Sequence, residues 1–295
     1  MARFPDVPVV YACHSSTLEI ETPLPHPQIR EVVAVDESCA ARCLQRGVPA
    51  DKLSVILNAV DMERFKRRAP LPDAPTKALL LTKNKGHRRS VRTACKKAGL
   101  LLDELGPGAG RVIPNLEAVL GNYDLVFATA RMALEAAAVG CAVVVCDARG
   151  FAGMLTSHNL RSWRPMNFGI GLLTLPVTSE RLGQAVRQYD AADAKLVTDE
   201  LRQSATADRY VQQHLAAYQR AIEAPSPSPD KIAAATAYWV EELAVTSAER
   251  KWREVAIELG LIARRRQRGR LLTRARRLVL QRIFGRKATQ GQAGR

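Results

Sequence analysis

Residues Arg131–Asp147 have the sequence RMALEAAAVGCAVVVCD. Alanine, leucine, methionine and glutamate favour a helix over the first part of this stretch, and Gly140 is a residue type that often follows a helix end. The next run, Ala142–Cys146, is short, apolar and rich in valine, which is typical of a strand buried on both faces. A second apolar run, Asp124–Ala128, precedes the helix. This order of strand, helix and strand is typical of a parallel sheet with helical crossovers.

The same alternation of apolar runs and amphipathic stretches extends in both directions from this segment. We therefore predict an α/β protein built from Rossmann-like halves, with a long helical stretch over Ser179–Ala224. Further strands are expected at 8–13, 31–35, 53–57 and 78–82, and further helices at 38–44, 87–99 and 115–120.

Changes in composition divide the chain into three predicted parts. A basic, proline-rich connector at 66–75 separates two α/β blocks, and the sequence APSPSP at 224–229 is typical of a linker. We predict a partial N-terminal Rossmann-like segment at 1–68, a complete Rossmann-like domain at 69–224, and a linker, helices and a basic tail at 225–295.

Composition excludes several classes of protein. The 295 residues are 47% hydrophobic and 25% charged, which allows a buried core and excludes a disordered or collagen-like chain. The six cysteines are scattered without the spacing of a zinc site, and we expect all of them to be reduced core thiols. The richest apolar run, Ala133–Cys146, is too short for a membrane span and includes Glu135. We expect a cytoplasmic protein.

A basic loop, Lys83–Arg89 (KNKGHRR), lies between a predicted strand and a predicted helix. In a parallel sheet such loops gather at the carboxyl ends of the strands, where helix N-termini favour anionic ligands. Lys83, Lys85 and Arg88 are therefore candidates for neutralising a diphosphate without a metal ion. The loop lacks the glycine spacing and the Lys-Ser/Thr pair of a Walker A motif. A solvated basic turn with no ligand is an equally open interpretation.

A second candidate group lies at the start of the helix that follows Ala128. Thr129 is positioned to cap this helix, and Arg131 and Glu135 are four residues apart and so share one face. Glu135 has alanine, leucine and valine around it in the sequence, and a carboxylate in such a setting needs a partner. That partner is either structural, such as Arg131 or a backbone N–H, or a pair of vicinal hydroxyls such as those of a ribose.

The stretch Arg131–Asp147 resembles the donor-site helix and strand of retaining glycosyltransferases with the GT-B fold, of the family-4-like type. Val32–Phe65 is similar to the interdomain stretch of the same family, with RGVP at 46–49 and ILNAVDMERF at 56–65. The resemblance covers most of the chain up to the end of the long helical stretch. It implies a GT-B-like fold in which most of the N-terminal, acceptor-side domain is missing and the donor-binding domain is complete.

The resemblance also implies roles for the candidate residues. Glu135 matches the glutamate that holds the ribose of a nucleotide-sugar donor. Lys83, Lys85 and Arg88 fall where the family binds the diphosphate of that donor. His14, at the end of the first predicted strand, resembles a histidine near the transferred sugar. On its sequence alone, His14 is equally a strand-end histidine with a structural bond.

The sequence departs from the family pattern in two places. The family has another glutamate eight residues before the ribose-binding one, and this position is Phe127 here, so Thr129 or Arg131 would take its part in donor binding. The chain also begins almost at the strand that carries the histidine. The resemblance implies a retaining transferase with no cofactor, and with no metal because an Asp-x-Asp pair is absent. A protein that binds the nucleotide-sugar without transferring it is the alternative.

The positive charge is concentrated at the C-terminus. Beyond Glu258 there are 12 lysines and arginines and no acidic residue, so the net charge of +15 leaves only +3 for residues 1–258. Over 264–287, apolar residues at helical spacing are interleaved with arginines, which favours contact with an anionic membrane surface. An enzyme with an envelope or lipid-linked acceptor at the inner membrane face would use such an anchor. A solvated tail is another interpretation. No nucleic-acid partner is expected, because aromatic residues for base stacking are almost absent.

Overall fold

The computed structural model describes residues 6–18 and 25–241, together with residues 4, 21, 23, 249 and 252. The chain divides into two units, Met1–Ser228 and Pro229–Arg295. In the second unit, residues 229–241 are helical. The predicted membrane-binding tail at 264–287 lies outside the described residues. Within the described part, every helix is too short or too polar to cross a bilayer.

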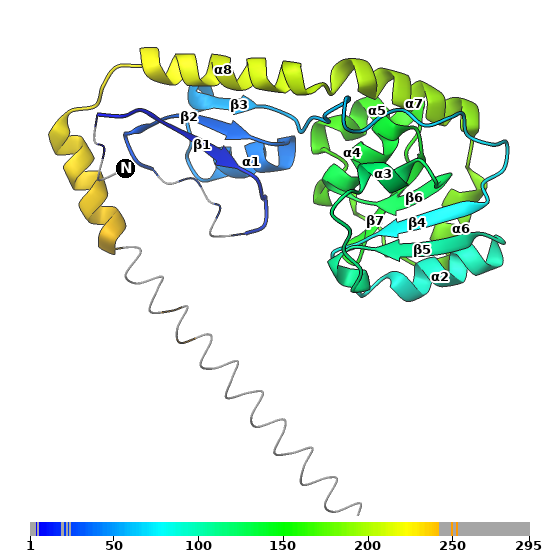
Figure 1. The fold of residues 1–295 in the computed structure, drawn as a ribbon. Helices are drawn as coiled ribbons and strands as arrows, with labels where there is room; N and C mark the ends of the chain where they lie inside the picture. The colour runs from blue at the N-terminus through cyan, green and yellow to red at the C-terminus, as the bar shows by residue number, and fades with distance from the viewer. Residues whose placement is uncertain are drawn as a thin grey trace, which may run out of the picture. The chain divides into compact units, whose positions relative to one another are not determined.

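A small parallel sheet opens the first unit (Figure 1). Its strands are β1 (Val9–Cys13), β2 (Ile29–Ala34) and β3 (Leu53–Val55), in the order β1-β2-β3. All six residues of β2 are buried, because both faces of the strand are covered. This confirms the parallel strands that were expected for the N-terminal segment.

Two helices cover the faces of this sheet. Helix α1 (Glu37–Gln45) is capped by Asp36, whose carboxylate accepts a bond from the Cys39 N–H, and it packs on the face that includes Val32. Helix α8 (Ala207–Glu223) packs on the opposite face, where Ala217 contacts the core around Val33. Residues 207–223 belong to the part of the sequence assigned above to the second domain, yet they pack on the first sheet. The chain therefore returns to the first sheet after it has formed the second one. A short 3₁₀ helix, η2 (Ala50–Lys52), precedes β3.

A second, larger sheet forms the rest of the first unit (Figure 1). The strand order is β5-β4-β6-β7-β8, with four parallel strands and β8 antiparallel to β7. All residues of β6 and β7 are buried, as the valine-rich sequence predicts. The strands are β4 (Lys77–Leu81), β5 (Leu101–Leu105), β6 (Leu125–Ala128), β7 (Ala142–Asp147) and β8 (Gly150–Met154).

Helices cover both faces of the second sheet. Helices α2 (Arg88–Lys97) and α6 (Ser179–Arg187) share one apolar cluster with the sheet, and α4 (Ala130–Val139) and α7 (Ala191–Ser204) share the cluster on the other face. This two-faced arrangement confirms the predicted α/β class. The remaining elements are α3 (Glu117–Leu120), α5 (Ser157–Trp163), and the 3₁₀ helices η3 (Pro107–Ala109), η4 (Arg164–Met166) and η5 (Ile170–Leu172).

Some elements differ from the sequence-based expectation. Strand β5, with the sequence LLDEL, was not predicted, because it is an edge strand that carries two acidic residues and pairs only with β4. Strand β8 and helix α5 were also not predicted. The stretch expected to be one long helical region contains three helices, because Asp190 and Thr206 cap new helices within it. All six cysteines are free and buried, as predicted.

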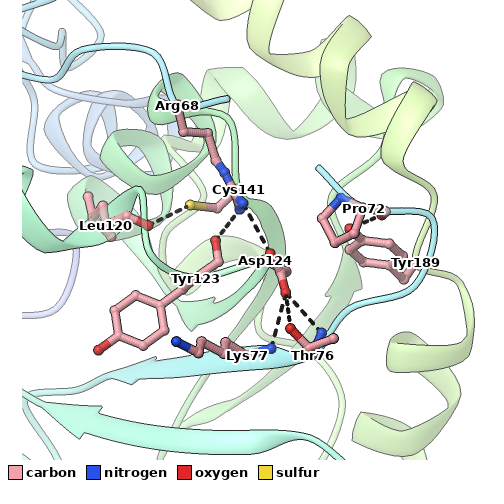
Figure 2. Close-up of polar contacts among 9 residues, drawn as sticks. All are labelled: Arg68, Pro72, Thr76, Lys77, Leu120, Tyr123, Asp124, Cys141 and Tyr189. Carbon is pink, nitrogen blue, oxygen red and sulfur yellow. Dashed lines mark hydrogen bonds and ion pairs between the residues drawn. The ribbon is translucent and has the colours of Figure 1, made fainter. Parts of the chain in front are cut away.

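A buried ion pair fixes the connector between the sheets to the second sheet, as Figure 2 shows. The Arg68 guanidinium donates to the carbonyl oxygen of Tyr123 at 2.5 Å and to Asp124 Oδ1 at 3.1 Å. The other carboxylate oxygen of Asp124 accepts bonds from the N–H and hydroxyl of Thr76 and from the N–H of Lys77, at 2.9–3.1 Å. Asp124 therefore ties the end of the connector to the first residue of β4.

The free energy of unfolding should depend strongly on Asp124. Burial acts to raise the pKa of this carboxyl, but the bonds from Thr76, Lys77 and Arg68 outweigh it and lower the pKa below its usual value. We expect Asp124→Asn to destabilise the fold by about 3–5 kcal/mol at pH 7, measured by urea denaturation. The exposed connector residue Asp73 supplies the control, since Asp73→Asn should change stability little.

The same pair has a defined pH dependence. Because the folded-state pKa is lowered, the stabilisation by Asp124 is present above the unfolded pKa of about 3.9 and is lost as the pH falls through the folded value. The difference between wild type and Asp124→Asn should therefore shrink in acid. An equal difference at pH 7 and in acid would contradict this assignment.

Candidate functional site

The carboxyl ends of β4, β6 and β7 open at one edge of the second sheet. These strands are parallel neighbours in the order β4-β6-β7, so the loops that follow them lie side by side. The loops are Thr82–His87 after β4, Thr129 with the start of α4 after β6, and Ala148–Arg149 after β7. We call this group the sheet-edge site. In open α/β sheets, ligands bind at this kind of edge.

The conformation of the basic loop is fixed by bonds between Thr82 and Asn84 and by the close approach of two glycines, Gly106 and Gly108. The Thr82 hydroxyl accepts a bond from the Asn84 N–H at 2.9 Å and lies 2.7 Å from the Asn84 carbonyl oxygen. A Cβ atom on Gly106 would lie 2.3 Å from the Thr82 oxygen, and one on Gly108 would lie 2.5 Å from the Asn84 nitrogen. Only glycine fits at these two positions. The loop is therefore built on a fixed backbone.

Lys83 and Lys85 are exposed on this fixed loop. Among the described residues, neither lysine forms an ion pair, so both ammonium groups are free to meet an anion. Arg88 is different. Its Nε donates to Glu104 at 2.5 Å and its terminal nitrogen donates to the Gly108 carbonyl at 3.1 Å. The guanidinium of Arg88 is thus engaged within the protein, whereas Lys83, Lys85 and the neighbouring Arg89 are exposed and form no ion pair among the described residues.

His87 does not contribute a charge to the loop. Its side chain is fully buried, and neither ring nitrogen has a hydrogen-bond partner among the described residues. Burial lowers the pKa of the imidazole, against weaker effects of Asp147 and Glu104 that raise it. His87 is the residue that directly precedes the first turn of α2.

The start of α4 is strained, and Thr129 does not cap it as predicted. The Thr129 hydroxyl donates to the Phe168 carbonyl at 3.0 Å instead of accepting from the helix. The Ala130 N–H donates to the same carbonyl at 2.7 Å. Ala130, Asn167 and Phe168 all have φ near +50°, which is rare for residues with a side chain. Such clusters of strained backbone occur at ligand sites, and here the strain adjoins the helix N-terminus.

Arg131 and Glu135 form the predicted pair on one face of α4. The Arg131 Nε lies 2.8 Å from Glu135 Oε1. The Arg131 side chain is 71% exposed and the Glu135 side chain only 10% exposed. Burial raises the pKa of Glu135, and the attraction of Arg131 and Arg64 opposes this only in part. Glu135 thus has the ionic partner that a structural role requires. That partner is a solvated side chain, and it compensates the buried charge of Glu135 only in part.

His14 lies outside the sheet-edge site, both by its position in the sequence and by the residues around it. It follows β1, is exposed, and its backbone N–H donates to the Glu21 carboxylate at 3.1 Å. Its side chain lines a cavity of about 390 Å³ with Tyr210, His214 and Tyr218 of α8. None of the predicted donor-binding residues lines that cavity. The role of His14 stays a prediction.

Asn167 is a residue of this region that the sequence analysis missed. Its side-chain amide donates to the Val35 carbonyl after β2, and its amide oxygen accepts bonds from the Asn58 N–H at 3.2 Å and from Arg164 at 2.5 Å. Asn167 thus connects the end of β2 with the β3–β4 connector, and the next residue, Phe168, binds the start of α4. The available signal was local: asparagine is one of the few residues that adopt positive φ readily.

Comparisons with known proteins agree on the fold. No protein-family model and no curated protein matches the sequence. Crystal structures of Anabaena HepE are similar to this chain: the complex with UDP at a TM-score of 0.51 and 14% identity, covering 71% of each chain. The complex with UDP and glucose has a TM-score of 0.50 and 17% identity, covering 71% of this chain and 70% of HepE. Sucrose-phosphate synthase from Thermosynechococcus elongatus is similar at a TM-score of 0.46 and 14% identity, covering 66% of this chain and 59% of the synthase. The chain has the α/β fold of GT-B glycosyltransferases.

Stability should reveal whether Glu135 is a structural residue. Its folded-state pKa is raised, so ionisation of the carboxyl costs stability as the pH rises through the folded value. We therefore expect Glu135→Gln to unfold at a higher urea concentration than wild type at pH 8, and the difference to shrink at pH 4, where the carboxyl is largely protonated in both states. The exposed carboxylate Glu200 of α7 provides the control variant Glu200→Gln. A large loss of stability in Glu135→Gln at pH 8 would identify a structural role.

Proposed function

We propose that this chain is a GT-B glycosyltransferase that uses a nucleotide-sugar donor. The observation that carries the proposal is the sheet-edge site itself. Two exposed, unpaired lysines lie on the loop after β4, and an incompletely compensated, buried carboxylate lies in α4, the helix that follows the adjacent strand β6. A donor of this class presents an anionic diphosphate and a ribose diol a short distance apart. The likeness of the fold to HepE, which was crystallised with UDP, supports the same assignment.

In this proposal the diphosphate lies against Lys83 and Lys85. Fixed cations stabilise the negative charge that develops on a leaving diphosphate, and such preorganised groups need no metal ion. The proposal gives Arg88 a supporting part, because its contact with Gly108 holds one of the two glycines that pack against the loop. The N-terminus of α4 adds its dipole, and Thr129 and Arg131 flank it.

The ribose would bind Glu135. An ionised carboxylate accepts bonds from two vicinal hydroxyls and so gains the compensation that Arg131 supplies only in part. Glu135 is buried within α4, while the side chain of its partner Arg131 is mostly exposed to solvent. The raised pKa of Glu135 fits a carboxylate whose full set of partners includes a ligand.

The proposed reaction is transfer with retention of configuration at the sugar. The bond between the sugar and the diphosphate breaks, the acceptor oxygen attacks from the same face, and the acceptor proton passes to the departing phosphate oxygen. An envelope saccharide or a lipid-linked saccharide is the proposed acceptor, and His14 the group proposed beside the transferred sugar. The protein would work on the cytoplasmic side of the membrane.

A protein that binds a nucleotide-sugar without transferring it is the second candidate. Phe127 favours it, because this fully buried β6 residue stands where the resembled family has a carboxylate. Donor binding is common to both candidates, and turnover separates them.

Removal of the two loop lysines tests the donor site. We expect Lys83→Ala/Lys85→Ala to weaken binding of UDP-glucose by about tenfold or more in calorimetry, and any transfer rate by about 10²–10³-fold, because the leaving charge loses its fixed partners. The matched control is Lys96→Ala/Lys97→Ala, which removes two exposed lysines from the far end of α2. Equal affinity in wild type and the loop variant would contradict the proposal. Binding with no turnover would favour the second candidate.

The basic tail is proposed to hold the protein at an anionic membrane surface. Each basic residue near such a surface contributes about 1 kcal/mol of attraction, so the tail at 264–287 is sufficient for anchoring. We expect full-length protein to sediment with vesicles that contain phosphatidylglycerol, and a variant ending at residue 263 to stay in the supernatant. Neutral phosphatidylcholine vesicles are the control. Equal sedimentation of both proteins would contradict the anchor.

A further inference from the structure

A second cavity lies between the two segments that join the sheets. It has a volume of about 330 Å³. One wall is the connector after β3, including Asn58, and the other is the junction of α7 and α8 around Ser204. The two segments are bonded to each other, since the Val60 N–H donates to the Ala205 carbonyl at 2.9 Å. We call this space the connector cavity. None of the residues proposed to bind the donor lines it, and His14 does not line it either.

Arg164 of η4 lines the connector cavity with a positive charge that lacks a counterion. Its guanidinium donates to the amide oxygen of Asn167 at 2.5 Å and to the carbonyl oxygen of Asn58. Both acceptors are neutral. Among the described residues no carboxylate pairs with Arg164, whereas Arg68 and Arg88, which are also partly buried, each pair with an acidic side chain.

A partly buried guanidinium without a counterion favours the binding of an anion. Removing a charge from water is costly unless an opposite charge compensates it. Burial lowers the pKa of Arg164 to about 10. The two bonds to Asn167 and Asn58 orient the guanidinium and leave further N–H groups available. A planar guanidinium held in this way matches the paired oxygens of a phosphate or carboxylate.

The rest of the lining fits a small hydroxylated molecule. Arg209 adds a second cation at the exposed side, and the polar side chains of Ser204 and Gln213 line the same space. Glu37 is also part of the lining, and its carboxylate is an acceptor for hydroxyl groups. The volume lies at the low end for ligand sites, which suits a monosaccharide better than a complete nucleotide-sugar.

We propose that the connector cavity binds an anionic monosaccharide, with its phosphate or carboxylate on Arg164 and its hydroxyls toward Glu37 and Gln213. This site is separate from the proposed donor site and does not depend on it. Because both connecting segments form its walls, a bound sugar contacts both of them at once. A sugar bound there is therefore positioned to respond to a change at the connection between the two sheets, whereas a ligand at the proposed donor site is not.

Calorimetry on the full chain tests the proposal. The protein carries Lys83→Ala/Lys85→Ala, so that the proposed donor site cannot take the anion, and the probes are glucose 6-phosphate, glucuronate and neutral glucose. We expect saturable binding of at least one anionic sugar and none of glucose at about 10 mM. Preference between the two anionic probes distinguishes a phosphate from a carboxylate ligand. Arg164→Gln should weaken that binding by about tenfold or more, because it removes the charge.

Two further variants keep the test decisive. Arg161→Gln removes an exposed cation of α5 that lies outside the lining of this cavity, and it should leave the affinity unchanged. If Arg164→Gln does not fold, as judged by circular dichroism, Gln213→Trp replaces it, since this exposed α8 residue lines the cavity and a large ring there occupies the space. Unchanged affinity in a folded cavity variant, equal binding of glucose, or no binding of either anionic sugar would overturn the proposal. Failure of the donor proposal would show instead as no UDP-glucose binding by wild type.

Discussion

The inner strands β6 and β7 of the second sheet are buried on both faces, and this constraint determines where polar chemistry can occur along them. Every residue of these two strands is buried, so the exposed charged groups associated with them lie beyond the strand ends. At the amino ends, Asp124 and Arg68 fasten the connector to the sheet. At the carboxyl ends, Lys83 and Lys85 are exposed on the loop after β4, and Glu135 is buried in α4, the helix that follows β6. One edge of the sheet thus stabilises the fold and the other provides the candidate site.

The two edges differ in how completely buried charge is compensated. Asp124 accepts bonds from a guanidinium, two backbone N–H groups and a hydroxyl, and its pKa is lowered despite burial. Glu135 has one solvated partner, and its pKa is raised. Within the part of the chain that the structure describes, the guanidinium of Arg164 has only neutral partners. A saturated charge is typical of a structural role, whereas an unsaturated one at an edge or a cavity indicates room for a ligand. Both functional proposals rest on this distinction.

Much of the fold follows from sequence patterns, and the parts that do not have physical reasons. The apolar run of β7 and the helix-forming residues of α4 predict their own structures. The spacing of Arg131 and Glu135 predicts that they share one face of the helix, and an ion pair forms there. Strand β5 escaped prediction because its pairing with β4 is the source of its order. The contact of Asn167 with Asn58 joins residues 109 positions apart, and no local pattern encodes it. Thr129 was expected to cap α4, but the Phe168 carbonyl competes for its hydroxyl.

The central claim is that Glu135 holds the ribose of a nucleotide donor, and a thermodynamic cycle tests it most directly. Calorimetry would compare UDP with 2′,3′-dideoxy-UDP on wild type and on Glu135→Gln. The account predicts that loss of the ribose hydroxyls weakens binding to wild type far more than to the variant, with a coupling of about 1.5–3 kcal/mol for bonds to a charged group. A coupling of zero, with UDP bound equally by both proteins, would contradict it.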